Sequence, residues 1–544
     1  MNEPPAPFPN RRHWLLLAAG LAVLFVGFLG SRGLNEPDEG RYANIAQAMT
    51  RPGGGWWEPR MSGYGHYDKP PLVYWVTAAS FRLFGLHEWS ARLPSLLGAA
   101  CTLVGLGWAA FRLRGGAVAW WAVLIGGTSV QCWVFGRILS PDMLLTGWCT
   151  LAVAAWAEAR WRLTMRPGGA WGWWLLSLAL WTLAWWTKAT PALIPLLGLT
   201  AGVFLTGDGP GRRALQPWLL FPGIIALGSP WYLSMLSTYP ELKGFFFGRE
   251  LAGRLAGRVD GRHGHFLYYL PVSLVAWLPW WPLGAFLAWK NRRRFSSDAA
   301  PLPWRQRPGV EGWMVLVGLL ILSLTASKLP SYTLTLAPWA ALLLARVIAP
   351  RATTRPFVWR EPLLWPAAGF FAVTMLGSAT LPRRFESRLG VNSSVREVAG
   401  FLRQQGAAQV DAERYLPGLE FYLDENRVRY IVRIDGAARS NPSASGRKRP
   451  PRIERYHERA SDPGVPPDRF VDPDLWPVPP PTQAPGQSGW WIVSLHRREP
   501  PRFLRNWPST AGNPRPVKVR RIGDFDLYRM PVPPPPVTNK YPPP

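Results

Sequence analysis

The sequence lacks several features that define common classes of protein. It has only three cysteines in 544 residues, and all three (Cys101, Cys132 and Cys149) fall inside apolar runs. This distribution predicts neither a disulfide framework nor a cysteine-based metal site. There is no glycine-rich loop followed by Lys and Ser or Thr, the pattern that cradles nucleotide phosphates. After about residue 385 there is also no apolar run long enough to cross a membrane.

Acidic residues are scarce relative to basic ones. The chain has 61 Lys and Arg but 33 Asp and Glu, a formal charge of +28. Most of the short basic clusters lie between apolar runs, where excess Lys and Arg marks the cytoplasmic side of a membrane. They do not form one patch, so the charge predicts membrane topology and not nucleic-acid binding.

Residues from about 13 to 381 contain repeated apolar runs of roughly 20 residues, the length that spans a bilayer. The first run follows Arg11-Arg12-His13 without a clear cleavage site, so we interpret it as an uncleaved span. We read the short segment 71–85 as an interfacial helix. The expected spans number about eleven: 13–31, 91–111, 117–135, 143–159, 171–187, 190–206, 217–236, 266–289, 311–326, 332–348 and 362–381.

This topology places the arginine-rich loops inside and the N-terminus in the cytoplasm. The loop after the first span, the turn before Asp142, the loop 237–265 and the C-terminal region then face outside. The expected fold is therefore a polytopic α-helical membrane domain, 1–384, with an outer loop 32–90, followed by an extracytoplasmic α/β domain, 385–530. A Pro-rich insertion (436–488) and tail (531–544) are expected to be flexible or disordered.

Within the soluble region, helical periodicity begins at Val395. Strand patterns occur at 428–434, 490–495 and 524–530. We find no catalytic constellation in this half of the chain.

The outer loop carries a polar cluster that is costly beside lipid and therefore suggests a functional site. Asp38 and Glu39 are candidate catalytic acids, and Arg41 and Tyr42 are candidate substrate-binding residues. A carboxylate at a helix start can act as a base or stabilise a cationic sugar-like transition state. The alternative is that it only caps the helix. Asp38 is favoured over Glu39, although both can take part.

Other outer-face residues could bind a negatively charged lipid phosphate. Lys69, Lys328 and Arg254 are cations and Tyr332 is a hydroxyl donor, as a leaving phosphate requires. Lys69 could instead extend its amine to the headgroups. Asp142, which opens a span, is either a third catalytic acid or a helix cap. His66 with Asp68 could hold zinc or another divalent ion, but their spacing is not diagnostic.

Five ordered motifs resemble those of the GT-C class of membrane glycosyltransferases. They are Asp-Glu-Gly-Arg-Tyr-Ala (38–43), Asp-Lys-Pro-Pro-Leu-Val-Tyr-Trp (68–75), Ser-Ala-Arg-Leu-Pro (90–94), Phe-Leu-Tyr-Tyr-Leu-Pro (266–271) and Ser-Lys-Leu-Pro-Ser-Tyr (327–332). The greatest likeness is to the bacterial 4-amino-4-deoxy-L-arabinose lipid A transferases, which are akin to protein O-mannosyltransferases. It covers about residues 13 to 381, and more loosely extends to about 434.

The resemblance implies an inverting transferase of the bacterial inner membrane, with a periplasmic C-terminal domain and a sugar donor on undecaprenyl phosphate. It implies that Asp38 and Asp142 are the functional acids, and that Lys69 and Tyr332 bind the lipid phosphate. The acceptor would be a lipid A phosphate. One departure is Glu250-Leu251, where the family carries a Glu-His pair that helps to bind a metal.

Two other functions remain open. A protein O-mannosyltransferase-like enzyme would use a protein hydroxyl as acceptor, and Asp38 would then have to remove its proton. A transporter or flippase of the lipid-linked sugar predicts ionisable groups in the middle of spans and repeated halves. The predicted spans are largely free of charge, which favours chemistry at the surface.

Overall fold

The computed structural model describes the chain in two compact units. One, here the membrane unit, comprises Met1–Leu29 and Tyr67–Thr380, and the other, here the sheet unit, comprises Gly30–His66 and Leu381–Pro544. The predicted outer loop 32–90 is thus divided between the two. The described residues are 9, 11–61, 64–165, 169–207, 215–253, 264–290, 309–352, 362–380, 395–412, 416–423, 428–431, 470–471, 490–495 and 516–529.

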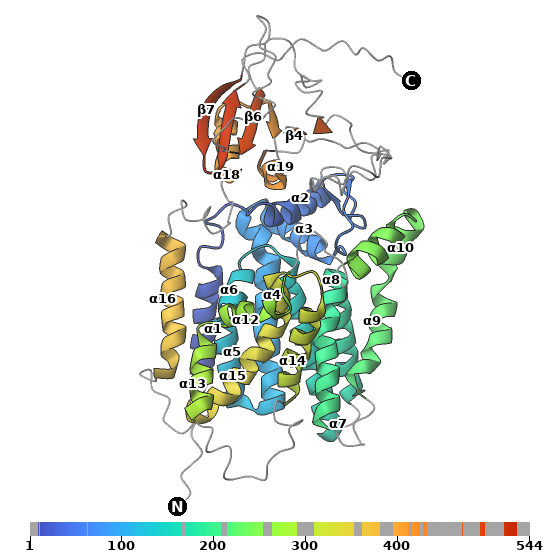
Figure 1. Ribbon diagram of the computed structural model, residues 1–544, viewed down its shortest axis with the longest axis vertical. Coiled ribbons are helices and arrows are strands. Elements are labelled where there is room, and N and C mark those ends of the chain that lie inside the picture. The colour runs from blue at the N-terminus through green and yellow to red at the C-terminus, as the bar shows by residue number, and fades with distance from the viewer. Residues whose placement is uncertain are drawn as a thin grey trace, which may run out of the picture. The chain divides into compact units, whose positions relative to one another are not determined.

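The membrane unit is built from helices, which Figure 1 colours from blue to orange along the chain. They are α1 (Arg11–Val26), α3 (Leu72–Phe84), α4 (Glu88–Arg114), α5 (Gly116–Gly127), α6 (Val130–Phe135), α7 (Pro141–Met165), α8 (Ala170–Thr206), α9 (Leu220–Gly228), α10 (Pro230–Thr238), α12 (Tyr269–Ala276), α13 (Trp280–Lys290), α14 (Gly309–Leu324), α15 (Ala337–Ala352) and α16 (Trp365–Thr380). The shorter segments include the π-helix η4 (Gly244–Gly253) and the 3-10 helix η8 (Pro330–Leu336).

Four stretches among the described residues are long and apolar enough to cross a membrane: Glu88–Arg114, Ala170–Thr206, Pro217–Thr238 and Pro330–Ala349. The pair α12 and α13, bent by 95°, is a fifth candidate. The chain is a multi-pass membrane protein. The expected span 117–135 is divided into α5 and α6. The helix α14, within another expected span, has only 16 residues. The expected total of eleven stays a prediction.

Helix α8 reverses direction at Lys188, whose backbone is non-helical (φ −163°, ψ 89°). A straight helix of its 37 residues would be about 55 Å long. The chain from Thr206 to Leu215 can extend at most about 32 Å. Yet Leu215 packs with Ala170, at the start of α8. The run must therefore fold back on itself, as the separate predicted spans 171–187 and 190–206 require.

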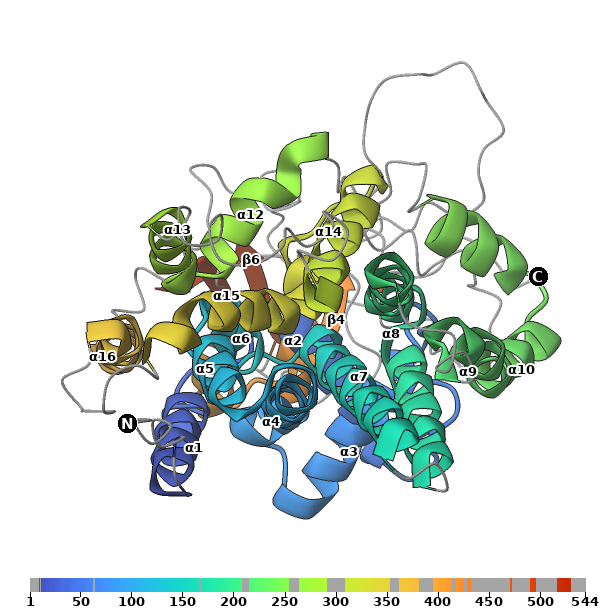
Figure 2. The ribbon, with the colours of Figure 1, turned by 90° about the horizontal axis from the view of Figure 1, so that it is seen from below.

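Helices α4 and α7 pack closely because glycines face the partner backbone. A Cβ atom built on Gly98 would lie 2.6 Å from the backbone nitrogen of Leu144, and one on Gly105 would lie 2.8 Å from that of Leu151. Small residues permit such approach in membrane bundles, where packing drives helix association. Seen along the helices in Figure 2, α4 and α7 lie side by side. This contact fixes the first turn of α7, which carries Asp142.

Buried carboxylates pair with arginines at the C-terminal end of α4. Arg112 and Arg162 bind Glu158, which is 2% exposed. Arg114 and Arg346 bind Glu311, which is 1% exposed, with N–O distances of 2.8 and 2.7 Å. At the opposite end of the same helix pair, the Oγ of Ser95 accepts a hydrogen bond from the backbone N–H of Ser140, and Arg92 of α4 donates to the backbone carbonyl of Leu29. The membrane unit thus has two chemically different ends.

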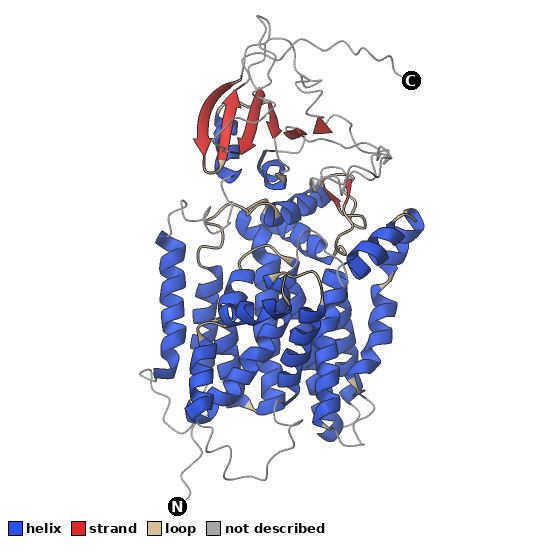
Figure 3. Ribbon diagram, in the orientation of Figure 1, coloured by secondary structure: helices blue, strands red, loops and turns tan. Residues whose placement is uncertain are grey.

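The sheet unit contains a six-stranded sheet in the order β5-β4-β3-β6-β8-β7, drawn red in Figure 3. The strands β5, β4, β3 and β6 run parallel to one another, whereas β8 runs antiparallel to β6 and β7. Its elements are α18 (Val395–Gln404), β3 (Gln409–Ala412), α19 (Pro417–Leu423), β4 (Val428–Ile431), β5 (Phe470–Val471), β6 (Trp490–Leu495), β7 (Val517–Ile522) and β8 (Phe525–Arg529).

The core of the sheet unit forms because α18 places apolar residues at helical spacing. Val395, Val398 and Leu402 pack with Val410 of β3 and Trp491 of β6. The strands expected near 428, 490 and 524 appear as β4, β6 and β8, whereas β3 and β7 were not predicted. Strand β5 lies within the expected insertion 436–488; the rest of that insertion and the tail lie outside the described residues.

The segment carrying the acidic motif belongs to the sheet unit. Helix α2 (Asp38–Thr50) follows Pro37, and the hairpin strands β1 (Arg60–Met61) and β2 (Tyr64–Gly65) come after it. Almost every residue of α2 between Glu39 and Met49 is buried. Contacts with α19 and with β1 contribute to this burial, although α2 is polar on average.

The close packing of α4 on α7 predicts unequal effects of two Gly→Ala substitutions. Gly98→Ala should lower stability by about 1–3 kcal/mol, because the new methyl group meets backbone that cannot yield. Gly20→Ala, inside α1, meets nothing within 4 Å and should be neutral or slightly stabilising. Thermal unfolding of both variants in detergent checks this. Equal melting temperatures for the two variants would contradict the packing argument.

Candidate active site

Asp142 and Lys188 form a buried ion pair in the membrane unit. The Lys188 Nζ lies 2.5 Å from the Asp142 Oδ1, and the side chains are 8% and 13% exposed. Asp142 lies in the first turn of α7, where free backbone N–H groups favour a negative side chain. The Oγ of Ser140 donates to the Asp142 Oδ2 at 3.2 Å. Asp142 is therefore more than a helix cap: it has a dedicated cationic partner.

Tyr332 completes this cluster from a third segment. The Lys188 ammonium lies 5.0 Å from the centroid of the Tyr332 ring, within the range of a cation–π contact. Lys188 reaches both partners because the chain reverses there, which turns its side chain out of the helical path. Sequence reasoning did not select Lys188 as a site residue. The available signal was its position as the one cation between two predicted apolar spans.

Lys328 has a different environment. Its Nζ donates to the backbone carbonyls of Leu322, Ser323 and Thr325 at 2.8–3.2 Å, at the end of α14. It also lies 5.3 Å from the Tyr269 ring centroid. Burial lowers the pKa of Lys328. These contacts make it a cap for the helix C-terminus, and its predicted phosphate contact stays a prediction.

Lys69 lies near a second acid of the membrane unit. Its Nζ donates to the backbone carbonyl of Asp68 at 2.8 Å and lies 4.0 Å from an Oε of Glu250 in η4. Lys69 therefore faces the very position at which the resemblance predicts a Glu-His pair. The side chain is 12% exposed, so it is not simply extended into solvent.

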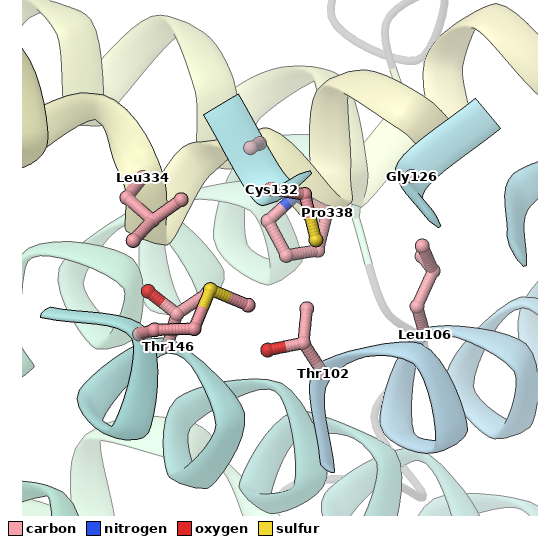
Figure 4. A pocket seen from close by; sticks show the side chains of 9 residues that line it. Thr102, Leu106, Gly126, Cys132, Thr146, Leu334 and Pro338 are labelled. Carbon is pink, nitrogen blue, oxygen red and sulfur yellow. The ribbon is translucent and has the colours of Figure 1, made fainter. Parts of the chain in front are cut away.

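A small apolar pocket lies one helical turn from Asp142, between α4, α5, α6, α7 and the segment that continues into α15 (Figure 4). Met143 and Leu334 line it, and Thr102 and Thr146 contribute hydroxyls. Both hydroxyls donate to backbone carbonyls of their own helices. The lining therefore offers apolar contacts and is unsuited to a sugar phosphate.

In the sheet unit, Asp38 is the accessible acid of the motif. Its side chain is 64% exposed, and its Oδ1 lies 2.5 Å from an amino group of Arg41. Arg41 also packs over the Tyr42 ring, with 5.4 Å from Cζ to the centroid. Glu39 is only 2% exposed, and its Oε2 accepts the backbone N–H of Asn35. Glu39 thus bonds the backbone at the start of α2, Asp38 is the more exposed of the two acids, and the catalytic role of both stays a prediction.

Glu36 is a buried acid of the polar cluster in the outer loop, to which the sequence analysis assigned no role of its own. Its Oε1 accepts the backbone N–H of Gly418 at 2.5 Å, and the described structure shows no hydrogen bond for its Oε2. Burial raises the pKa of Glu36 to about 8; the Gly418 N–H opposes this shift, while the nearby Glu420 adds to it. Glu36 is therefore protonated at neutral pH.

Three of the predicted site residues are not part of any site that the structure describes. Arg254 lies outside the described residues. His66 belongs to the sheet unit and Asp68 to the membrane unit. Within the described part of the chain, no group of three His, Cys, Asp or Glu side chains could hold a metal ion. The zinc hypothesis stays a prediction without a ligand set.

Known proteins resemble the chain in both sequence and fold. Residues 68–232 match the model of the dolichyl-phosphate-mannose-protein mannosyltransferase family. An undecaprenyl phosphate-α-4-amino-4-deoxy-L-arabinose arabinosyl transferase of Enterobacter sp. is 30% identical over 62% of this chain and 59% of its own length. A counterpart from Pseudomonas fluorescens is 32% identical over 62% and 60%. The matched part of the chain thus spans about three-fifths of these relatives.

The fold likeness extends over almost the whole chain. The crystal structure of ArnT from Cupriavidus metallidurans bound to undecaprenyl phosphate matches with a TM-score of 0.70 over 96% of this chain and 98% of that one, at 21% identity. The fold is that of a GT-C membrane protein. In sequence, the chain is similar to the aminoarabinose transferases of bacteria, as its motifs predict.

The Asp142–Lys188 pair predicts a rescue by double substitution. Lys188→Met should destabilise the protein by about 3–5 kcal/mol, because it leaves a buried carboxylate unpaired. Adding Asp142→Asn removes that charge and should restore most of the melting temperature. Thermal unfolding of the two single variants and the double variant measures the coupling. Strictly additive losses would show that the two side chains do not interact.

The pKa of Glu36 predicts a pH-dependent stability. A folded-state pKa of about 8, above the ordinary 4.5, stabilises the protonated folded state. This contribution is complete below about pH 4.5 and is lost as the pH rises through about 8. Relative to Glu36→Gln, the wild type should therefore lose on the order of a few kcal/mol over that range. Melting curves from about pH 5 to pH 9 test this, with exposed Glu397→Gln as control; parallel curves for wild type and Glu36→Gln would contradict it.

Proposed function

We propose that the protein is an inverting glycosyltransferase that moves a sugar from undecaprenyl phosphate to an acceptor. Aminoarabinose, or a related sugar, transferred to a lipid A phosphate is the reaction that the relatives support best. The observation that carries the proposal is the buried Asp142–Lys188 pair. Both residues lie within 68–232, the range matched by a family of lipid-phosphate-sugar transferases.

The reaction is a single displacement at the anomeric carbon. An oxygen of the acceptor attacks that carbon, a new C–O bond forms, and the bond to the undecaprenyl phosphate oxygen breaks with inversion. Both electrons of that bond leave with the phosphate, so cations and hydrogen-bond donors are needed where its charge develops. Lys69 and Tyr332 are proposed for this role, and Arg254 is a further candidate.

The acceptor determines what the acids must do. A lipid A phosphate is already anionic and needs no strong base. Exposed Asp38 would then orient the amine-bearing sugar or stabilise its positive charge in the transition state. Asp142, already paired with Lys188, would hold that lysine in place and not accept a proton itself.

A protein O-mannosyltransferase-like activity is the second candidate, and the description of the matched family favours it. A serine or threonine acceptor would have to lose its proton, and Asp38 would then serve as the base. The two candidates differ in the acceptor that carries the sugar after turnover, which is lipid A in the first and a serine or threonine side chain in the second. A flippase gains no support from the paired acids at the helix ends.

The proposal includes the orientation in the bacterial inner membrane. The arginine-rich end of the membrane unit, with Arg112, Arg114 and Arg346, would face the cytoplasm together with the N-terminus. The end carrying Ser140, Asp142 and Tyr332 would face the periplasm, as would the sheet unit. Eleven spans fit this orientation. A zinc requirement involving His66 and Asp68 is tested by assaying activity after chelation.

Asp38→Asn should reduce the release of undecaprenyl phosphate by about 100-fold or more, because it removes the accessible carboxylate. The assay uses purified protein with undecaprenyl-phosphate aminoarabinose and lipid A, followed by mass spectrometry of the lipids. Exposed Glu241→Gln is the matched control and should retain wild-type release. Normal turnover by a folded Asp38→Asn variant would remove Asp38 from the mechanism.

A further inference from the structure

Helix α19 of the C-terminal region is hydrogen-bonded to the segment carrying the acidic motif. The backbone N–H of Leu34 donates to the Tyr422 hydroxyl at 2.9 Å. The Asn44 side-chain amide donates to the Glu420 Oε2 at 2.8 Å, and both groups are buried. Together with the bond from Gly418 to Glu36, three polar contacts connect regions of the sequence more than 370 positions apart.

Two glycines bring these segments as close as backbones can approach. A Cβ atom built on Gly40 would lie 2.6 Å from the Gly418 backbone nitrogen and equally near the Glu36 Oε1. Only glycine leaves the space that this contact needs. The hydrogen bonds and the close approach define a seam made of Leu34, Glu36, Gly40 and Asn44 on one side and α19 on the other.

The geometry of α2 relates this seam to Asp38. Gly40 and Asn44 are four residues apart and so lie on one face of the helix. At about 100° per residue, Asp38 lies roughly opposite that face. This explains why Asp38 is 64% exposed although its neighbours are buried. The seam covers one side of α2 and turns the acid away from α19.

We propose that α19 is a positioning element for the acidic motif: Gly418, Glu420 and Tyr422 fix the start and rotation of α2 and thereby the direction of Asp38. The helix α19 then contributes to catalysis by positioning Asp38, although α19 itself contributes no reacting group. The catalytic part of this inference rests on the proposed function, but the mechanical part does not.

The charges around the seam fit this role. Glu36 faces Glu420 from α19 and Asp38 and Arg41 from α2. A protonated Glu36 avoids repulsion with Glu420, whereas its ionisation would place two carboxylates in one buried seam. The seam is therefore tightest when Glu36 is neutral.

The test compares two substitutions at one position. Glu420→Gln retains an acceptor for Asn44, whereas Glu420→Ala leaves that buried amide unpaired. If α19 positions Asp38, Glu420→Ala should lower kcat by about 10–100-fold with a nearly unchanged KM for the lipid donor, and Glu420→Gln should stay within about threefold of wild type. The same pair of substitutions at exposed Glu397 of α18 should leave both constants unchanged.

A second comparison tests whether the effect passes through Asp38. In an Asp38→Asn background, Glu420→Ala should cause little further loss, because there is no carboxylate left to misplace. An undiminished additional loss would overturn the positioning role. So would an equal kcat in wild type and a folded Glu420→Ala variant. If Glu420→Ala does not fold, Tyr422→Phe, which removes only the hydroxyl that accepts from Leu34, replaces it.

Hydrogen exchange decides the mechanical claim independently of any activity. In the full-length protein, amides of α2 should exchange at least about tenfold faster in Glu420→Ala than in wild type, while those of α4 should not change. Unaltered exchange in α2 would contradict the inference. The wild type could release no undecaprenyl phosphate while Glu420→Ala still speeds exchange in α2. That result would contradict the proposed function and support the positioning of α2 by α19.

Discussion

An ionised side chain inside an apolar helix bundle requires a partner of opposite charge. In the membrane unit, Asp142 and Lys188 meet this requirement for each other. The acid lies at the start of α7, whose close packing on α4 depends on glycines, and the base lies where α8 reverses. Neither charge is tolerable without the other. The pair therefore ties the start of α7 to the turn in α8 and places both charges inside the bundle.

In the sheet unit, the helix that carries the acidic motif is stabilised by contacts from outside its own segment. This helix, α2, is polar and short, and it lacks a side-chain cap at its start. Such a helix is marginal by itself. Buried hydrogen bonds to α19 and a protonated Glu36 supply what the local sequence does not. Two carboxylates two residues apart thus serve opposite purposes, since Glu36 is buried and neutral whereas Asp38 is exposed and paired with Arg41.

Local pattern explains what the sequence predicted well. Apolar runs indicated the helices, the cation between two runs coincided with the reversal in α8, and strand patterns marked β4, β6 and β8. The motifs selected Asp38, Asp142 and Tyr332. Partners distant in sequence were beyond such patterns: Lys188 lies 46 positions from Asp142, and Gly418 lies 382 positions from Glu36. Lys328 was interpreted from its motif alone, because its carbonyl partners depend on where α14 ends.

The most direct test of the account follows the sugar itself. The purified protein is reconstituted into sealed vesicles with labelled undecaprenyl-phosphate aminoarabinose and lipid A, and the mass and anomeric configuration of the lipid A product are measured. We predict lipid A that carries the label, with the anomeric configuration inverted relative to the donor. Intact donor that has only changed leaflet, with unmodified lipid A, would contradict the account and identify a transporter.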